Sequence, residues 1–181
     1  MWILLGVLVV LGLALISLYN GLVTLRQRVR NAWSQIEVQL RRRFDLLPNL
    51  VETVKGYATH EREVFERVTE ARAQVSAAQG IDEQIEAQNV LGGALRGLLA
   101  VAENYPQLQA SGNFKELQTE LANTESKIAF SRQFYNDTVM KLNTRVERFP
   151  ANLVAGAFGF AQMPYYEVED EAARDPVQVK F

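Results

Sequence analysis

The sequence contains no cysteine and only one histidine in 181 residues. The absence of cysteine excludes disulfide bonds, thiolate nucleophiles and cysteine-based zinc sites. A single histidine excludes a two-histidine zinc motif and a histidine-rich metal cage. The sequence also has no excess of basic residues, since it contains 19 Lys and Arg and 21 Asp and Glu. We therefore expect no metal, no cofactor and no nucleic-acid partner.

Length and apolar content set the size of the folded body. On a prior of roughly 100–200 residues per domain, the chain is expected to form one domain plus any targeting segment. Apolar residues make up 48% of the sequence, which is enough to build a core.

Residues 1–18, MWILLGVLVVLGLALISL, form an apolar run whose only polar side chain is Ser17. As a helix this run reaches about 27 Å, close to the thickness of the hydrocarbon core. A cleaved signal peptide is the alternative, but no Lys or Arg precedes the run, and residues 18–20 make a poor cleavage site. We predict an uncleaved transmembrane anchor; a buried core helix is the third interpretation.

Positive charge follows the anchor and predicts its orientation. Residues 19–43 contain a single acidic residue, Glu37, and six arginines: Arg26, Arg28, Arg30, Arg41, Arg42 and Arg43. Basic residues beside a membrane span favour the cytoplasmic side, so we predict the N-terminus outside and the body in the cytoplasm. The three nearest arginines, 26, 28 and 30, are candidates to face lipid. The triplet at 41–43 fits either lipid attraction or a solvated helix face.

Spacings of three and four residues between apolar positions predict an all-α fold, in which the anchor helix continues into an antiparallel bundle of long helices. The predicted body covers residues 19–150, with helices at about 19–46, 48–78, 82–103 and 113–149. Pro48 is expected to kink or split the first long run, so that 48–78 is a second helix or the second half of one bent rod. Gly92, Gly93 and Gly97 lie inside the third helix. There we favour close internal helix packing over an oligomer contact.

The segment 151–181 differs in composition from the helices. Its first part, residues 151–163, is small, apolar and aromatic, and its last part is acidic. We predict that 151–163 caps one end of the bundle, with contact to lipid or to a partner as alternatives. The terminal residues 176–181 are extended by composition, either docked on the bundle or bound to a partner as a linear peptide.

The residues that catalysis needs are not gathered into a recognisable motif. His60 lies in a highly charged helical stretch, where a lone histidine is expected at the surface. Carboxylates such as Glu66 and Glu70 sit among basic residues at helix-surface spacing. We therefore predict that the chain is not an enzyme. Polar residues that interrupt apolar faces are instead expected to form hydrogen bonds between helices: Trp33, Asn49, Lys55, Tyr57, Tyr135 and Asn136.

Several motifs resemble the LemA family of bacterial membrane-anchored helical proteins. The longest lies at residues 39–61, QLRRRFDLLPNLVETVKGYATHE, and shorter ones lie at 19–23, 32–36, 134–136, 142–143, 148–152, 159–160 and 176–181. The resemblance covers essentially the whole chain. It implies an anchored bundle of long helices in the bacterial inner membrane without an established catalytic site. Members are often encoded beside a membrane zinc protease of the HtpX type, which implies a possible partner.

The motif positions are our candidates for residues critical to the fold or to partner binding: Arg42, Asp45, Pro48, Asn49, Lys55, Tyr57, Arg148, Phe149, Pro150 and Asn152. The functional prediction is a single-pass membrane protein whose cytoplasmic bundle acts as a scaffold or adaptor, or assembles with itself. The alternative prediction is a module that binds anionic lipid or shapes the membrane.

Overall fold

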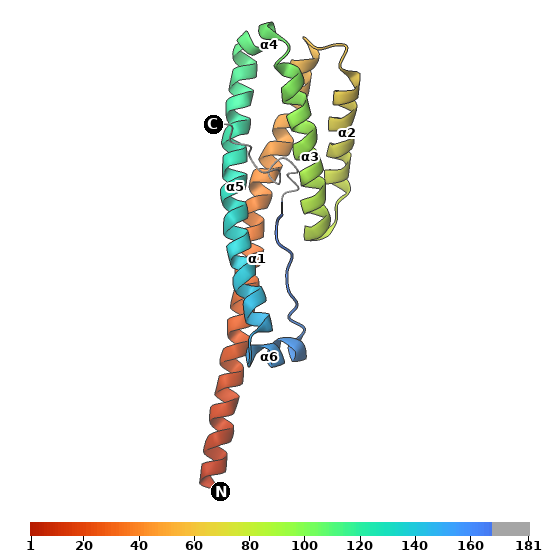
Figure 1. Cartoon of the computed structure of the whole chain (residues 1–181). Coiled ribbons are helices and arrows are strands. Elements are labelled where there is room, and N and C mark those ends of the chain that lie inside the picture. The colour runs from red at the N-terminus through yellow and green to blue at the C-terminus, as the bar shows by residue number, and fades with distance from the viewer. Residues whose placement is uncertain (168–181) are drawn as a thin grey trace, which may run out of the picture. The chain divides into compact units, whose positions relative to one another are not determined.

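The computed structural model describes residues 1–167, and these contain six helices and no strand. The helices are α1 (Trp2–Lys55), α2 (Arg62–Ala77), α3 (Gly80–Ala102), α4 (Pro106–Ala110), α5 (Gly112–Glu147) and α6 (Ala151–Phe158) (Figure 1). The predicted all-α fold is confirmed. Our predictions for the acidic end of the chain, including 176–181, lie outside the described residues.

The chain divides into two compact units, and α1 and α5 each contribute to both. Unit 1 contains residues 1–45 and 120–165, and the described part of unit 2 contains residues 46–119, 166 and 167. Each unit is described by itself below.

In unit 1, the first part of α1 pairs with the second part of α5 in antiparallel fashion. Trp33 and Tyr135 meet edge to face with ring centroids 5.4 Å apart. Arg43 forms an ion pair with Glu125. Arg43 follows Trp33 along α1 while Glu125 precedes Tyr135 along α5, so the two helices run in opposite directions. Both rings of the aromatic pair are buried. The apolar stripes recognised in the sequence supply the core between these helices: Leu22, Val29, Ile36 and Leu40 from α1, and Leu121, Ile128, Val139 and Leu142 from α5.

Helix α6 closes one end of unit 1. Its buried residues Val154 and Ala155 form a cluster with Phe160 and with Leu22 of α1, and Leu18, Val23 and Val146 pack against this cluster. Gly159 ends the helix in a left-handed conformation with φ of 69°, which glycine adopts without strain. Val154, Ala155 and Phe160 of the segment 151–163 therefore pack on α1.

In unit 2, α2 and α3 lie side by side (Figure 1). The core of this unit includes Leu47, Leu50 and Val54 from the end of α1, Val68 of α2 and Leu91 of α3. The short helix α4 begins with Pro106, at a position where a missing N–H costs little.

The predicted break at Pro48 was wrong. Helix α1 continues through Pro48 to Lys55, and the chain leaves the helix over residues 56–61 before α2 begins. A proline inside a helix costs about 3 kcal/mol. Leu47 and Leu50 on either side are buried, and each fully buried leucine stabilises the fold by about 1.5–3 kcal/mol. The predicted helix 48–78 is thus two helices, while those predicted at 82–103 and 113–149 correspond to α3 and α5 within two residues at each end.

Close helix packing was the wrong explanation for two of the α3 glycines. A Cβ atom added at Gly97 would meet nothing within 4 Å, and one added at Gly93 would reach only the Arg96 side chain at 4.0 Å. The described structure therefore leaves room for a methyl group at both positions.

We expect Gly97→Ala to stabilise the protein by about 1 kcal/mol, because alanine favours a helix over glycine by that amount. Gly80→Ala serves as the control of opposite sign, since Gly80 has a φ of 84° that alanine rarely adopts. Urea unfolding in detergent followed by circular dichroism measures both variants. A loss of stability in Gly97→Ala would contradict the open environment seen at this position.

Candidate functional site

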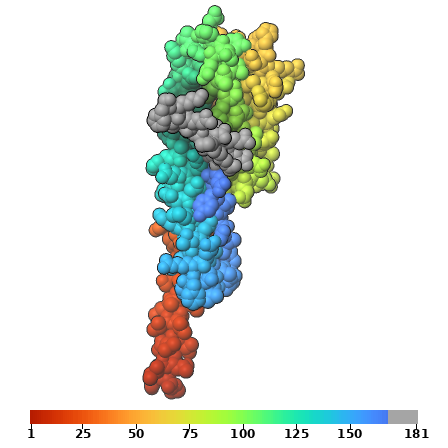
Figure 2. All heavy atoms as spheres, in the orientation of Figure 1, coloured from red at the N-terminus to blue at the C-terminus, as the bar shows by residue number. Residues whose placement is uncertain are grey.

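The N-terminal part of α1 is long and apolar enough to cross a membrane, and none of that stretch is buried within the protein. In unit 1 it extends as a single helix with no other element beside it (Figure 2). Leu5, Leu8, Val10 and Leu13 all expose more than half of their side chains. Among the described residues, this is the one helix that meets the length and composition of a membrane span.

The three arginines after this stretch have different environments. Arg28 and Arg30 are exposed, as expected for side chains that face a charged surface. Arg26 is half-buried, and its guanidinium carbon lies 4.7 Å from the centre of the Phe160 ring. This is within the range of a favourable cation–π contact. Arg26 therefore also holds the segment after α6 against α1.

The arginine triplet is engaged in ion pairs. Arg41 pairs with Asp45 at 3.3 Å on the surface of α1, whereas Arg42 pairs with Glu120 and Arg43 with Glu125 across to α5. The Arg43 side chain is only 5% exposed, while that of Glu125 is 44% exposed. Arg42 and Arg43 thus join the two long helices of unit 1, a role that neither interpretation of the sequence included.

We expect Glu125→Gln to destabilise the protein by about 1.5 kcal/mol, the lower end for a hydrogen bond to a charged group, because Arg43 is buried and would lose its compensating charge. Asp45→Asn is the matched control: the Arg41–Asp45 pair is exposed on both sides, and such pairs contribute about 0–1 kcal/mol. Equal effects in the two variants, measured by urea unfolding, would contradict this difference in burial.

The other candidate positions on α1 are solvent-exposed. Asp45, Pro48 and Asn49 are exposed, and the backbone carbonyl of Asn49 accepts a hydrogen bond of 2.7 Å from the Thr53 hydroxyl. Lys55 and Tyr57 are also exposed. The expectation that Asn49, Lys55 and Tyr57 interrupt a buried helix face was therefore wrong, because each lies beside the apolar stripe of α1 or beyond its end.

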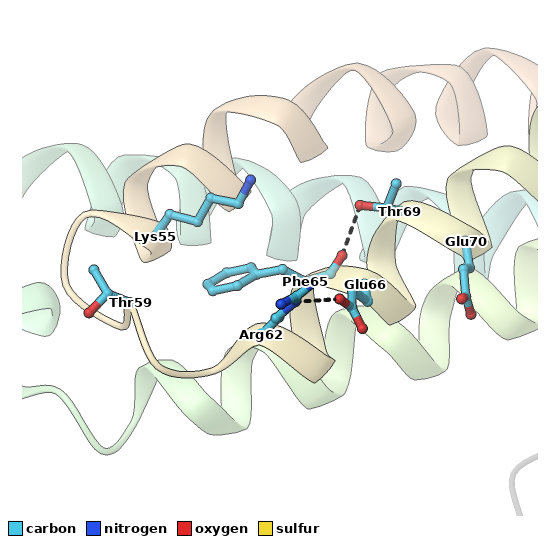
Figure 3. Close-up of a pocket in the computed structure, with 7 residues that line it drawn as sticks. All are labelled: Lys55, Thr59, Arg62, Phe65, Glu66, Thr69 and Glu70. Atoms are coloured by element: carbon cyan, nitrogen blue, oxygen red, sulfur yellow. Dashed lines mark hydrogen bonds and ion pairs between the residues drawn. The ribbon is translucent and has the colours of Figure 1, made fainter.

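Lys55 borders an open groove in unit 2 with a volume of about 670 Å³. Its other lining residues are Thr59, Arg62, Phe65, Glu66, Thr69 and Glu70 (Figure 3). The Lys55 ammonium lies 5.6 Å from the Phe65 ring centre, and Arg62 donates a 2.7 Å hydrogen bond to Glu66. Because these charges are paired and exposed, the groove has the chemistry of a helix surface.

Chemical reactivity has little support in the described residues. His60 is exposed, and residues 1–167 hold no group of three or more His, Asp or Glu side chains that could bind a metal ion. Glu66, which lines the groove, takes part in an ordinary i,i+4 ion pair with Arg62.

The C-terminal candidates gather around the start of α6. Arg148, Phe149 and Asn152 are exposed, and Pro150 occupies the N-cap. The backbone N–H of Asn152 donates a 3.0 Å hydrogen bond to the Arg148 carbonyl. They are far from Arg42, because its partner Glu120 lies 27 residues before the end of α5, or about 40 Å along a helix. The candidate residues in unit 1 therefore do not form one site.

Two residues that the site prediction omitted hold the chain after α6. The Asn143 amide donates to the Met163 carbonyl and its Oδ1 accepts from the Met163 N–H, both at 2.9 Å. The Tyr135 hydroxyl donates to the Pro164 carbonyl at 2.9 Å. The sequence could have indicated Asn143, because it is a polar residue next to Leu142 on the apolar face of α5. The structure shows that both residues are buried.

Comparisons with known proteins agree with these features. The family model described as the LemA family matches residues 32–181. Magnetosome protein MamQ 2 of Paramagnetospirillum magneticum is 28% identical over 189 residues, covering 90% of this chain and 69% of the relative. Magnetosome protein MamQ of Magnetospirillum gryphiswaldense is 27% identical over 189 residues, which also cover 90% of this chain and 69% of the relative.

A third relative carries the family name itself. Protein LemA of Metamycoplasma hominis is 27% identical over 139 residues, which cover 75% of this chain and 63% of the relative. The family model covers most of the chain, from the middle of α1 onward. This protein, whose described residues are largely helical and include one candidate membrane span, belongs to the LemA family.

Proposed function

We propose that this chain is a non-enzymatic, single-pass membrane protein whose helical body serves as a scaffold or adaptor at the bacterial inner membrane. The observation that carries the proposal is the continuity of α1. One helix runs from a stretch with no protein neighbours into the buried core of unit 1. A continuous helix holds that core at a set distance from the bilayer, which suits a scaffold.

Exposed aromatic residues on α5 supply a surface for a partner. Phe130 and Phe134 lie one turn apart in unit 1 and are 74% and 48% exposed. They point away from the buried stripe that includes Ile128 and Tyr135. Large exposed apolar side chains that cluster in this way are typical of contact surfaces.

The proposed occupants of this surface are other membrane proteins or a second copy of the chain. A membrane zinc protease of the HtpX type is the first candidate, on the basis of the family resemblance alone. The relatives named as magnetosome proteins suggest that related chains act with organised membrane structures.

Site-specific photocrosslinking in the native cells tests the proposal. A photoreactive amino acid is placed at Phe130 in the full-length chain, and in a matched control at Met140, which is exposed on another side of α5. We expect one adduct that is specific to Phe130, either with a membrane protein or with a second copy. Membrane-inserted protein that gives no adduct above the Met140 background would contradict the scaffold role of this surface.

The proposed orientation places the N-terminus outside and the helical body in the cytoplasm. Because the chain has no cysteine, a single introduced thiol can test this orientation. Ser126 is exposed on α5, so Ser126→Cys places a single thiol on the body. We expect a membrane-impermeant maleimide to label it only after the cells are broken. Labelling in intact cells would place the body outside and overturn the cytoplasmic assignment.

Binding of anionic lipid is the alternative function, and it rests on the exposed Arg28 and Arg30 directly beyond the span. Such residues contribute about 1 kcal/mol each near an anionic surface. Reconstitution of the full-length protein into vesicles with and without phosphatidylglycerol tests it. Vesicle deformation that requires the anionic lipid and disappears at high salt would favour this alternative over the scaffold.

A further inference from the structure

Helix α6 and its flanks combine exposed apolar side chains with an absence of charge. Phe149, Leu153 and Phe158 are 74%, 65% and 63% exposed, and together they are called the apolar patch below. Residues 149–163 contain no Asp, Glu, Lys, Arg or His. Exposed apolar side chains that lie within an uncharged segment mark a contact site for an apolar partner.

The position of α6 along α1 identifies that partner. Leu18, Leu22 and Val23 of α1 pack on the cluster that contains Val154 and Ala155. The Tyr19 ring lies 5.0 Å from the Phe158 ring and 5.7 Å from the Phe160 ring. Because residues 1–18 span about 27 Å, a hydrocarbon core of about 30 Å ends near Asn20. Helix α6 therefore meets α1 where the apolar span ends.

The orientation of α6 and the charges around it fit the same boundary. Figure 1 shows α6 lying crosswise to α1 within unit 1, as a helix in the plane of a membrane surface would lie. Arg148 directly precedes the apolar patch in the sequence. Arg26, which follows the apolar span along α1, lies over the Phe160 ring. Tyrosine and other aromatic side chains favour the interface, with cations at the level of the lipid headgroups.

We propose that α6 is an interfacial helix, which rests on the membrane surface with the apolar patch inserted at the boundary between headgroups and acyl chains. The inference rests on the proposed membrane anchoring by α1. The occupant is phospholipid because the patch is continuous, through Tyr19 and Leu18, with a span that is exposed on all sides. The helical body would then be held at two points, the span and α6, and its tilt on the membrane would be restricted.

The test uses the cysteine-free full-length chain, reconstituted in vesicles of phosphatidylethanolamine and phosphatidylglycerol. A nitroxide spin label is attached to single thiols introduced by Leu153→Cys and Phe158→Cys, each in a separate protein. Leu8→Cys is the reference inside the span, and Ser126→Cys is the reference in water. The measured quantity is the ratio of collision rates with oxygen, which enriches in the bilayer, and with a water-soluble nickel chelate.

We expect the ratio at positions 153 and 158 to be several-fold higher than at position 126 and lower than at position 8. Ratios at 153 and 158 equal to that at 126 would overturn the interfacial position. Spin–spin broadening that disappears on dilution with unlabelled protein would also overturn it, by showing that a second copy covers the patch. A water-like ratio at position 8 would instead show that the anchoring proposal itself is wrong.

Discussion

Asn143→Asp is expected to destabilise the protein by about 2–4 kcal/mol at pH 7. The replacement keeps the shape of the side chain but removes the N–H group that donates to the Met163 carbonyl. That carbonyl would lose a hydrogen bond and face a buried negative charge. A lost hydrogen bond contributes about 1 kcal/mol, and a buried acceptor left without a partner adds about 1–3 kcal/mol.

The same variant should add a pH dependence to the stability, because the introduced carboxyl titrates and the Asn143 amide does not. Burial raises the pKa of the introduced carboxyl above its ordinary value of about 3.9. Its protonated form can again donate to the Met163 carbonyl. The folded state therefore binds the proton more tightly than the unfolded state, and the destabilisation should shrink as the pH falls from 7 towards 4. Urea unfolding at several pH values, relative to the parent, measures this recovery.

A second variant and a control separate the Asn143 contact from general damage. Asn143→Ala removes both hydrogen bonds and should make the Met163 amide exchange its hydrogen faster, because the acceptor of that N–H is lost. Gln162→Ala alters the neighbouring position, where the side chain makes only an exposed contact with Glu147, and should change stability by less than about 0.5 kcal/mol. Equal effects at positions 143 and 162 would show that Asn143 does not hold this segment.

Periodicity predicted the helices well where one apolar stripe ran without interruption. The stripe of α5 includes Leu121, Ile128 and Val139, all buried, and its spacing indicated the face that packs. Pro48 shows the limit of this reasoning, because the local cost of a proline is known from sequence while the burial of Leu47 and Leu50 is not. The outcome depended on tertiary packing, which outweighed a local preference.

The polar contacts between helices were predicted less well, for a related reason. Asn49, Lys55 and Tyr57 were identified from their places near an apolar stripe, yet small errors in helical phase near Pro48 and Gly56 move a side chain from core to solvent. Arg42 did form a contact between helices. Its partner could not be predicted, because the pairing of α1 with α5 depends on a register that no local pattern contains.

Contacts that are distant in sequence account for the rest. Asn143 and Met163 are 20 positions apart, and Tyr135 and Pro164 are 29 apart. An expected short helix at 151–163 does not reveal that the chain beyond it returns along α5. The chain after α6 supplies the hydrogen-bond partners of two buried polar groups on the apolar face of α5, the Asn143 amide and the Tyr135 hydroxyl.

The buried aromatic pair of unit 1 should give the largest single effect. Tyr135 is fully buried, its ring meets Trp33, and its hydroxyl donates to Pro164. We expect Tyr135→Ala to destabilise the protein by about 3–5 kcal/mol, because it leaves a large cavity in the core. Tyr135→Phe keeps the ring and loses only the hydrogen bond, so it should cost about 1 kcal/mol.

Tryptophan fluorescence can report this prediction directly. The chain has two tryptophans, so a Trp2→Phe background leaves Trp33 as the only tryptophan, in contact with the Tyr135 ring. Tyr135→Ala should shift the Trp33 emission to longer wavelength, because water gains access to the indole, while Tyr135→Phe should leave it in place. Similar losses of stability in the two variants would assign the role of Tyr135 to its hydroxyl. A large loss in the alanine variant alone would assign it to the packing that joins α1 to α5 in unit 1.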